Sequence, residues 1–181
     1  MFKKLKPLFK KKSSVVEQPE TKIEESQLDF PIDRADYFFD HALVFYCEEN
    51  DIPSEKLSKS DMLEISKRAA FHLSVFVALL VKHDFLNPQS NGFNPEDEQK
   101  LKNETITGTD YLFKHLDEKL YSSDISDTLL PFISDFYEDY MDFCYTVLVD
   151  DIARSEFSWE IYHSVEDDID EIFSQYKTYI G

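Results

Sequence analysis

The sequence predicts a mainly helical (all-α), compact single-domain bundle of five to seven helices, and three observations support this fold class. Apolar residues make up 42% of the 181-residue chain and aromatic residues 15%, which is enough for a packed core and unusual for a disordered chain. Only 3 Gly and 7 Pro are present, so a sandwich with many tight turns is disfavoured. Residues 69–81 are almost entirely apolar, and residues 127–150 are amphipathic at helical spacing. We expect the core to form around these two segments.

The first 29 residues differ in composition from the rest of the chain. Residues 1–12 contain six lysines and no acidic residue, and residues 13–29 are polar without convincing periodicity. We therefore expect a basic arm and a linker, followed by an acidic helical domain at residues 30–181. A weak contact with anionic membrane is the alternative role of the arm. It would use Phe2, Lys3, Lys4, Leu5, Lys6, Leu8 and Phe9. A solvated arm is favoured, because the segment is short and Pro7 interrupts a helix.

Two helices are expected at the start of the domain. Residues 35–50 predict the first, and residues 61–83 predict the second, with Ser60 as its N-cap and Glu64 in its first turn. The middle of the second helix, residues 69–81, is apolar at eleven of thirteen positions, which is typical of a helix buried on most sides. It is too short to span a bilayer. The segment NPQSNGFNP that follows is the clearest loop in the chain.

The second half of the domain predicts four further helices. They cover residues 96–104, 109–116, 127–150 and 165–179. The longest of them is amphipathic, with an apolar face that includes Phe136 and Tyr140 and a polar face that carries only acids. The alternation of aromatic and polar residues at 157–163 also allows a short β-element there.

The chain is strongly acidic, with 19 basic against 37 acidic residues and a net charge of −18. Without the arm, 13 bases face 37 acids, which is a net charge of −24. Such a surface repels nucleic-acid phosphate, so we expect no direct nucleic-acid binding. No stretch of 18 apolar residues and no signal-peptide pattern is present, so a cytoplasmic protein is expected. Cys47 and Cys144 lie in apolar stretches and are expected to be buried free thiols.

The usual signatures of catalysis are missing from the sequence. It contains no GxGxxG, P-loop, HExxH or GxSxG motif, and its acids lack the spacing and the Gly of an EF-hand. Glu160 and His163 have the i, i+3 spacing of di-iron bundles, but one copy is present and a surface pair is favoured. His72 lies in the apolar helix and predicts a hydrogen-bonded core histidine. We therefore expect a protein that is not an enzyme and has no metal or other cofactor.

Residues 121–176 carry the most unusual charge pattern, with fifteen acidic residues and one base, Arg154. Charge of one sign across elements that pack together costs stability, and a basic protein partner would offset that cost. Aromatic residues among the acids suit a protein interface, because Tyr anchors while charge steers. An acidic surface that serves only solubility is the alternative. The predicted contact residues are Asp135, Tyr137, Glu138, Asp139, Asp142, Asp150 and Asp151.

Three segments resemble a known type of sequence. They are ALLVKHDFL at residues 78–86, ITGTDY at 106–111 with DEKL at 117–120, and FISDFYEDYMDFCY at 132–145 with YHSVED at 162–167. Together, over residues 60 to 172, they resemble a family of small acidic bacterial proteins of unclassified function that look like immunity proteins of polymorphic toxins. The resemblance implies a non-catalytic inhibitor that neutralises a basic cognate toxin by stoichiometric binding.

Two other functions remain open from the residues alone. Acids spaced along a helix can imitate phosphate spacing, so the protein is alternatively a nucleic-acid mimic that blocks a DNA-binding enzyme. A metal-dependent helical-bundle enzyme requires Glu160 and His163 to meet further carboxylates.

Overall fold

The computed structural model describes residues 29–180, and it confirms a mainly helical domain. The described chain contains seven α-helices, within the predicted range of five to seven, and a small two-stranded antiparallel sheet. The α-helices are α1 (Phe39–Asn50), α2 (Lys59–Ala69), α3 (Phe71–Lys82), α4 (Pro95–Lys102), α5 (Gly108–His115), α6 (Ile133–Thr146) and α7 (Trp159–Ile180). The strands are β1 (Pro31–Arg34) and β2 (Lys119–Tyr121), and short 3₁₀ helices cover Ala35–Phe38, Ser54–Lys56, Ser122–Asp124 and Leu130–Phe132.

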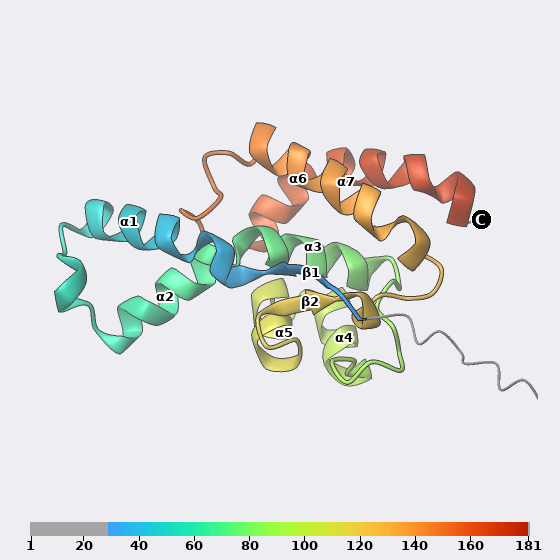
Figure 1. Ribbon diagram of the computed structural model, residues 1–181, viewed down its shortest axis with the longest axis horizontal. Helices are drawn as coiled ribbons and strands as arrows, with labels where there is room; N and C mark the ends of the chain where they lie inside the picture. The colour runs from blue at the N-terminus through green and yellow to red at the C-terminus, as the bar shows by residue number, and fades with distance from the viewer. Residues whose placement is uncertain (1–28, 181) are drawn as a thin grey trace, which may run out of the picture.

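Helix α3 lies in the middle of the molecule, as the apolar run predicted. In Figure 1, α6 and α7 lie above it, α4 and α5 lie below it, and α1 and α2 form a hairpin at one end. Every residue from Phe71 to Val81 is buried. The ring of Phe76 packs against Phe136 and Tyr140 of α6, with centroid distances of 5.6 and 4.8 Å. Because α3 is covered on all sides, it has apolar residues around its whole circumference.

The predicted helix at residues 61–83 is two helices, separated at Ala70. The prediction of Ser60 as N-cap is also wrong. Ser58 caps α2, since its hydroxyl accepts from the Asp61 N–H at 3.2 Å and the Asp61 carboxylate accepts from the Ser58 N–H at 2.7 Å. The break at Ala70 separates a half-exposed helix that pairs with α1 from one that is fully buried. No Gly or Pro marks it in the sequence.

The small sheet does not lie where the alternation at residues 157–163 allowed one. Strand β1 pairs with β2, with Asp33 opposite Leu120, and the two strands are too short to predict from their composition. Residues 159–163 instead begin α7, whose first turn is held by the Ser158 hydroxyl accepting from the Ile161 N–H at 3.2 Å. The aromatic residues pack around this helix start, and Phe157 meets Trp159 edge to face at 5.2 Å.

The other helices differ from their predicted limits mainly at their ends. Helix α6 covers the middle of the predicted segment 127–150, and a 3₁₀ turn and an irregular connection occupy its two ends. Helix α7 starts six residues earlier than the predicted residue 165. The predicted apolar face of α6 is confirmed, because Ile133, Phe136, Tyr140, Phe143 and Cys144 are all buried.

The predicted basic arm and nearly all of the linker, residues 1–28, lie outside the described residues. The residues proposed for membrane contact, Phe2 to Phe9, therefore remain a prediction. Within residues 29–180, no helix has both the length and the apolar character that crossing a membrane requires.

Candidate interaction surface

The outer side of α6 carries four exposed carboxylates. They are Asp135, Glu138, Asp139 and Asp142, which we call the acidic face. The helical period puts them there, because α6 turns Phe136 and Tyr140 toward α3 and α7. The face extends for about 10 Å, since α6 rises about 1.5 Å per residue.

No basic side chain described by the structure forms an ion pair with the acidic face. Among the described side chains, the Tyr176 hydroxyl of α7 reaches this face and donates a hydrogen bond to the Asp139 carboxylate at 2.6 Å. The pKa of Tyr176 is raised, first by burial, then by this hydrogen bond and by the negative charges of Asp139, Asp135 and Glu138. The acids of α6 therefore act together as a local negative field.

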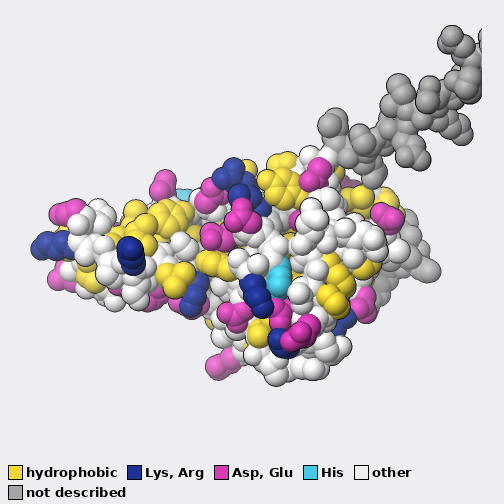
Figure 2. Space-filling model, turned by 90° about the horizontal axis from the view of Figure 1, so that it is seen from below, with side chains coloured by type: hydrophobic (Ala, Val, Ile, Leu, Met, Phe, Trp, Pro, Cys, Tyr) yellow, Lys and Arg dark blue, Asp and Glu magenta, His cyan; other side chains and the backbone are white. Residues whose placement is uncertain are grey.

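Most acids of the opposite side of the molecule form ion pairs with nearby bases. Asp97 of α4 is buried and accepts from Lys100 at 2.8 Å, from Lys114 and from His115 at 2.8 Å. These hydrogen bonds hold the pKa of its carboxyl well below the usual range. Lys82 is shared by carboxylates of two elements, Glu104 and Glu166. In the view of Figure 2, the blue Lys and Arg side chains lie among magenta Asp and Glu.

The structure separates the predicted contact residues into two groups. Asp150 is exposed in the connection after α6, and Asp151 is half-buried and accepts from the Ser155 hydroxyl at 2.6 Å. Tyr137 is not part of the exposed face. Its hydroxyl donates to buried Asp33, and its ring meets Phe76 edge to face at 4.9 Å. We therefore leave Tyr137 out of the surface and keep the six acids.

An apolar groove lies at the C-terminal end of α6, and sequence reasoning missed it. Its volume is about 270 Å³, and its walls are Phe38, His41, Phe45, Tyr145, Val149, Ile152 and Ala153. Tyr145 and Val149 are 54% and 55% exposed, which is high for large apolar side chains. Glu138, Asp142 and Tyr145 follow each other at i, i+4 and i+7, so one stripe of α6 leads from the acidic face to the groove.

The groove is formed by residues from distant parts of the chain, which is why no local pattern indicated it. Val147 and Val149 are exposed immediately after the acidic helix, but their exposure is visible only in the structure. The groove edge also holds a cation. The Arg154 guanidinium lies 3.7 Å from the centroid of the Phe45 ring and pairs with Glu49 at 3.4 Å.

The core histidine prediction is confirmed. His72 is fully buried, and its Nε2 lies 2.8 Å from a carboxylate oxygen of Asp33. Burial raises the pKa of Asp33, but hydrogen bonds from His72 and Tyr137 and the charge of His72 outweigh this and leave it below the usual value. The ring of Phe38 covers His72 at 4.5 Å. Because the cluster is enclosed, it serves to join β1, α3 and α6.

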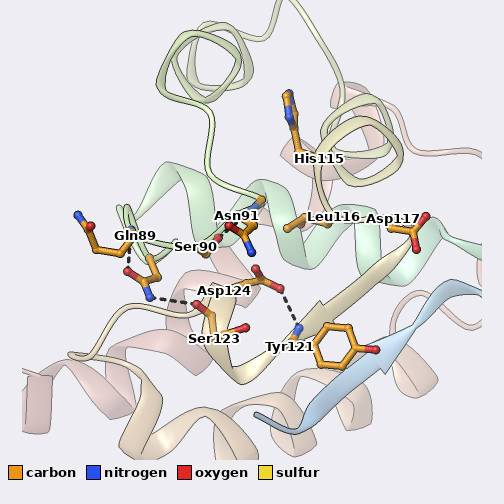
Figure 3. Close-up of a pocket in the computed structure, with 11 residues that line it drawn as sticks. Gln89, Ser90, Asn91, His115, Leu116, Asp117, Tyr121, Ser123 and Asp124 are labelled. Atoms are coloured by element: carbon orange, nitrogen blue, oxygen red, sulfur yellow. Dashed lines mark hydrogen bonds between the residues drawn. The ribbon is translucent and has the colours of Figure 1, made fainter. Parts of the chain in front are cut away.

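A polar pocket of about 360 Å³ lies between the loop after α3, the end of α5 and β2 (Figure 3). Asp124 lies in its wall, and burial raises the pKa of that carboxyl. Its polar groups largely satisfy one another. Asp124 accepts from the Tyr121 N–H at 3.0 Å, and the Asn87 amide donates to the Ser123 carbonyl at 3.0 Å (Figure 3). The Asn87 contact fastens the loop to the 3₁₀ turn Ser122–Asp124, and the Asp124 contact fastens that turn to the end of β2.

The two cysteines of the chain are not joined to each other. Cys144 is buried and Cys47 is half-buried, and both are free.

His163 does not pair with Glu160. Its Nδ1 lies 2.8 Å from Glu166, and its Nε2 lies 3.0 Å from Glu104. In residues 29–180, no group of three or more His, Cys, Asp or Glu side chains is arranged to hold a metal ion.

Comparison with known proteins gives one match. A family model described as a domain of unknown function (DUF7832) matches residues 32–164. The chain belongs to this family. The match covers the described domain from β1 to the start of α7, including the acidic face and the groove. The DUF7832 domain agrees with the resemblance to a family of unclassified function. No curated protein and no solved structure matches the chain.

Proposed function

We propose that this DUF7832 domain is a non-catalytic binding module that inhibits a basic protein by stoichiometric binding through the acidic face of α6. The observation that supports this most is that, among the side chains of residues 29–176, four neighbouring carboxylates of α6 meet no basic partner, whereas most acids of the opposite side do. A partner that brings Lys or Arg to this face would remove the repulsion between the acids. The resemblance to toxin immunity proteins suggests a cytoplasmic inhibitor of a basic toxin.

The expected chemistry of the interface has two parts. Long-range attraction between the negative face and a basic partner speeds association and selects against acidic competitors. Affinity requires a desolvated anchor as well, because exposed ion pairs contribute little. Tyr145 follows Glu138 and Asp142 on the same stripe of α6, and it is the exposed aromatic residue best placed to supply that anchor.

The first experiment identifies the partner. The protein is co-expressed with the product of the neighbouring gene, and growth and co-purification are measured. We expect the neighbour to inhibit growth alone and to be neutralised in a one-to-one complex. A neighbour that is harmless, or a toxic one that neither binds nor is neutralised, would contradict the proposal.

The second experiment tests the acidic face with charge-matched variants. The triple variant Asp135→Asn, Glu138→Gln, Asp142→Asn removes three charges from α6. Its control, Asp51→Asn, Glu55→Gln, Asp127→Asn, removes three charges from exposed acids elsewhere. We expect only the α6 variant to slow association, by about tenfold or more at low salt, because local charge steers the encounter.

Salt dependence completes this test. The loss should shrink as ionic strength rises, since the Debye length falls from about 10 Å at 0.1 M to about 3 Å at 1 M. Equal rates for the two triple variants would remove α6 from the interface. Competition by the protein for several unrelated DNA-binding proteins would favour nucleic-acid mimicry instead.

A further inference from the structure

We propose that the apolar groove beside α6 is the docking site of the chain's own basic arm, residues 1–12, through the apolar side chains between positions 2 and 9. The groove exposes Tyr145 and Val149, and the arm carries Phe2, Leu5, Leu8 and Phe9 among its lysines. Burying apolar side chains of the arm in the groove removes apolar surface of both from water, which favours docking. The proposal does not depend on a toxin partner.

Charge complementarity selects this occupant. The arm has six lysines and no acid, and the groove adjoins a surface whose carboxylates have no described cation. Asp142 lies one helical turn before Tyr145, Asp150 follows Val149 directly, and both are exposed. The Arg154 guanidinium, which lies over the Phe45 ring in the groove wall, is paired with Glu49 at 3.4 Å, so its charge is balanced by a carboxylate of the domain.

The length of the chain allows the contact. Phe38 is nine residues after Asp29, so the groove begins within about 32 Å of the first described residue. The sixteen residues 13–28 can span at most about 55 Å, which exceeds this distance. A tether of this length gives an effective concentration in the millimolar range, so a weak contact is sufficient for docking.

A membrane surface is the competing binding site for the basic arm, and electrostatic repulsion disfavours it. The rest of the chain carries a net charge of −24 and is repelled by the anionic lipid that would attract the lysines. The groove offers the lysines an acidic surface without that repulsion. A docked arm would also cover part of the acidic face and compete with any basic partner for it.

Photo-crosslinking in the full chain tests the proposal. A p-benzoylphenylalanine replaces Phe9, and mass spectrometry locates the products in dilute protein. We expect crosslinks to residues 145–153 or 38–45, at a yield several-fold above that of the same probe at Val16. Raising the salt concentration should lower the yield, because the attraction is electrostatic in part.

Matched variants of the groove give the control. Val149→Lys blocks the groove and should reduce the crosslink several-fold, whereas Val147→Lys should not, because Val147 is similarly exposed but does not line the groove. Equal melting temperatures of the two variants verify that both are folded. A crosslink yield that is unchanged by Val149→Lys, or that equals the yield from the probe at Val16, would overturn the proposal.

Two further outcomes identify another occupant. A yield that rises with protein concentration assigns the groove to the arm of a second copy. Flotation with vesicles of phosphatidylserine and phosphatidylcholine, lost when Phe2 and Phe9 are replaced by Ser, combined with background crosslinking to the groove, assigns the arm to the membrane. Either result overturns docking of the arm in its own groove.

Discussion

The acidic side chains on the two sides of α3 differ in whether they are paired with bases. Below α3, Asp97 is buried among Lys100, Lys114 and His115, and its carboxylate holds α4 and α5 together. Above α3, the four acids of α6 face solvent, and no described base pairs with them. The contrast teaches that the excess of acid in this chain is not spread evenly. In the lower half most carboxylates pair with bases, whereas the four carboxylates of α6 remain without a basic partner among the described side chains.

The first prediction concerns the enclosed acid, where the largest effect on stability is expected. Asp33→Ala should lower the free energy of unfolding by about 3 kcal/mol, because it leaves His72 and Tyr137 buried without their partner. Asp36→Ala is the control. It breaks an exposed pair with Arg34 and should cost less than about 1 kcal/mol. Urea unfolding of both variants measures the difference.

The same variant carries a pH signature. The folded state lowers the pKa of Asp33, so its stabilisation is present above its unfolded pKa of about 3.9 and is lost as pH falls through the folded value. The difference between wild type and Asp33→Ala should therefore shrink in acid. A difference that grows below pH 4 would contradict the assignment of a charged Asp33.

The second prediction tests how rigidly the lower half is packed. A Cβ added to Gly108 would lie 2.0 Å from the Ser74 carbonyl oxygen of α3, whereas one added to Gly92 would meet the movable Leu116 side chain at 2.5 Å. Gly108→Ala should cost about 2–3 kcal/mol, because backbone cannot move aside. Gly92→Ala should cost clearly less. Equal costs in thermal unfolding would show that α3 and α5 can separate.

The helical pattern made much of this fold predictable, and long-range contacts made the rest inaccessible. The apolar run of α3 and the amphipathic period of α6 depend on residues three or four apart, so the sequence displays them directly. The contact between the Tyr137 hydroxyl and Asp33 could not be predicted, because the two residues are 104 positions apart. The groove was missed for a related reason, since its walls come from α1, α6 and the connection after α6.

The acidic face itself was predictable, but its isolation from cations was not. A helical wheel shows which residues of α6 share a side, and the exposed acids lie where it put them. Whether a lysine from elsewhere reaches them depends on tertiary structure. Lys82 and Arg68 illustrate this, because each meets an acid far away in the sequence.

The third prediction concerns the stability of the acidic face. Neutralising Asp135, Glu138 and Asp142 together should leave stability unchanged or raise it by up to about 0.5 kcal/mol, because like charges at i, i+3 and i, i+4 repel. The single substitutions Asp135→Asn and Asp142→Asn should change the free energy of unfolding in opposite directions. Asp135 lies in the first turn of α6 and favours the helix dipole, whereas Asp142 lies nearer the C-terminus and opposes it. A loss above about 1 kcal/mol, outside what surface substitutions cause, would mean that these acids are structural.

The last prediction lies at the border between the two halves, where His163 of α7 pairs with Glu166 and Glu104. Hydrogen bonds to these two carboxylates raise the pKa of His163. A group whose pKa rises on folding stabilises fully below its unfolded pKa of about 6.5, and this is lost as pH rises through the folded value. Because the side chain is 42% exposed, we expect only a few tenths of a kcal/mol. His163→Gln should therefore lower the free energy of unfolding slightly at pH 5.5 and leave it unchanged at pH 8.5, as measured by urea unfolding. An NMR titration of the wild-type imidazole checks that its pKa is raised. If His163→Gln instead lost more stability at high pH, the contribution of His163 would not depend on a charged imidazole. Glu104 and Glu166 would then gain no stabilising charge from His163.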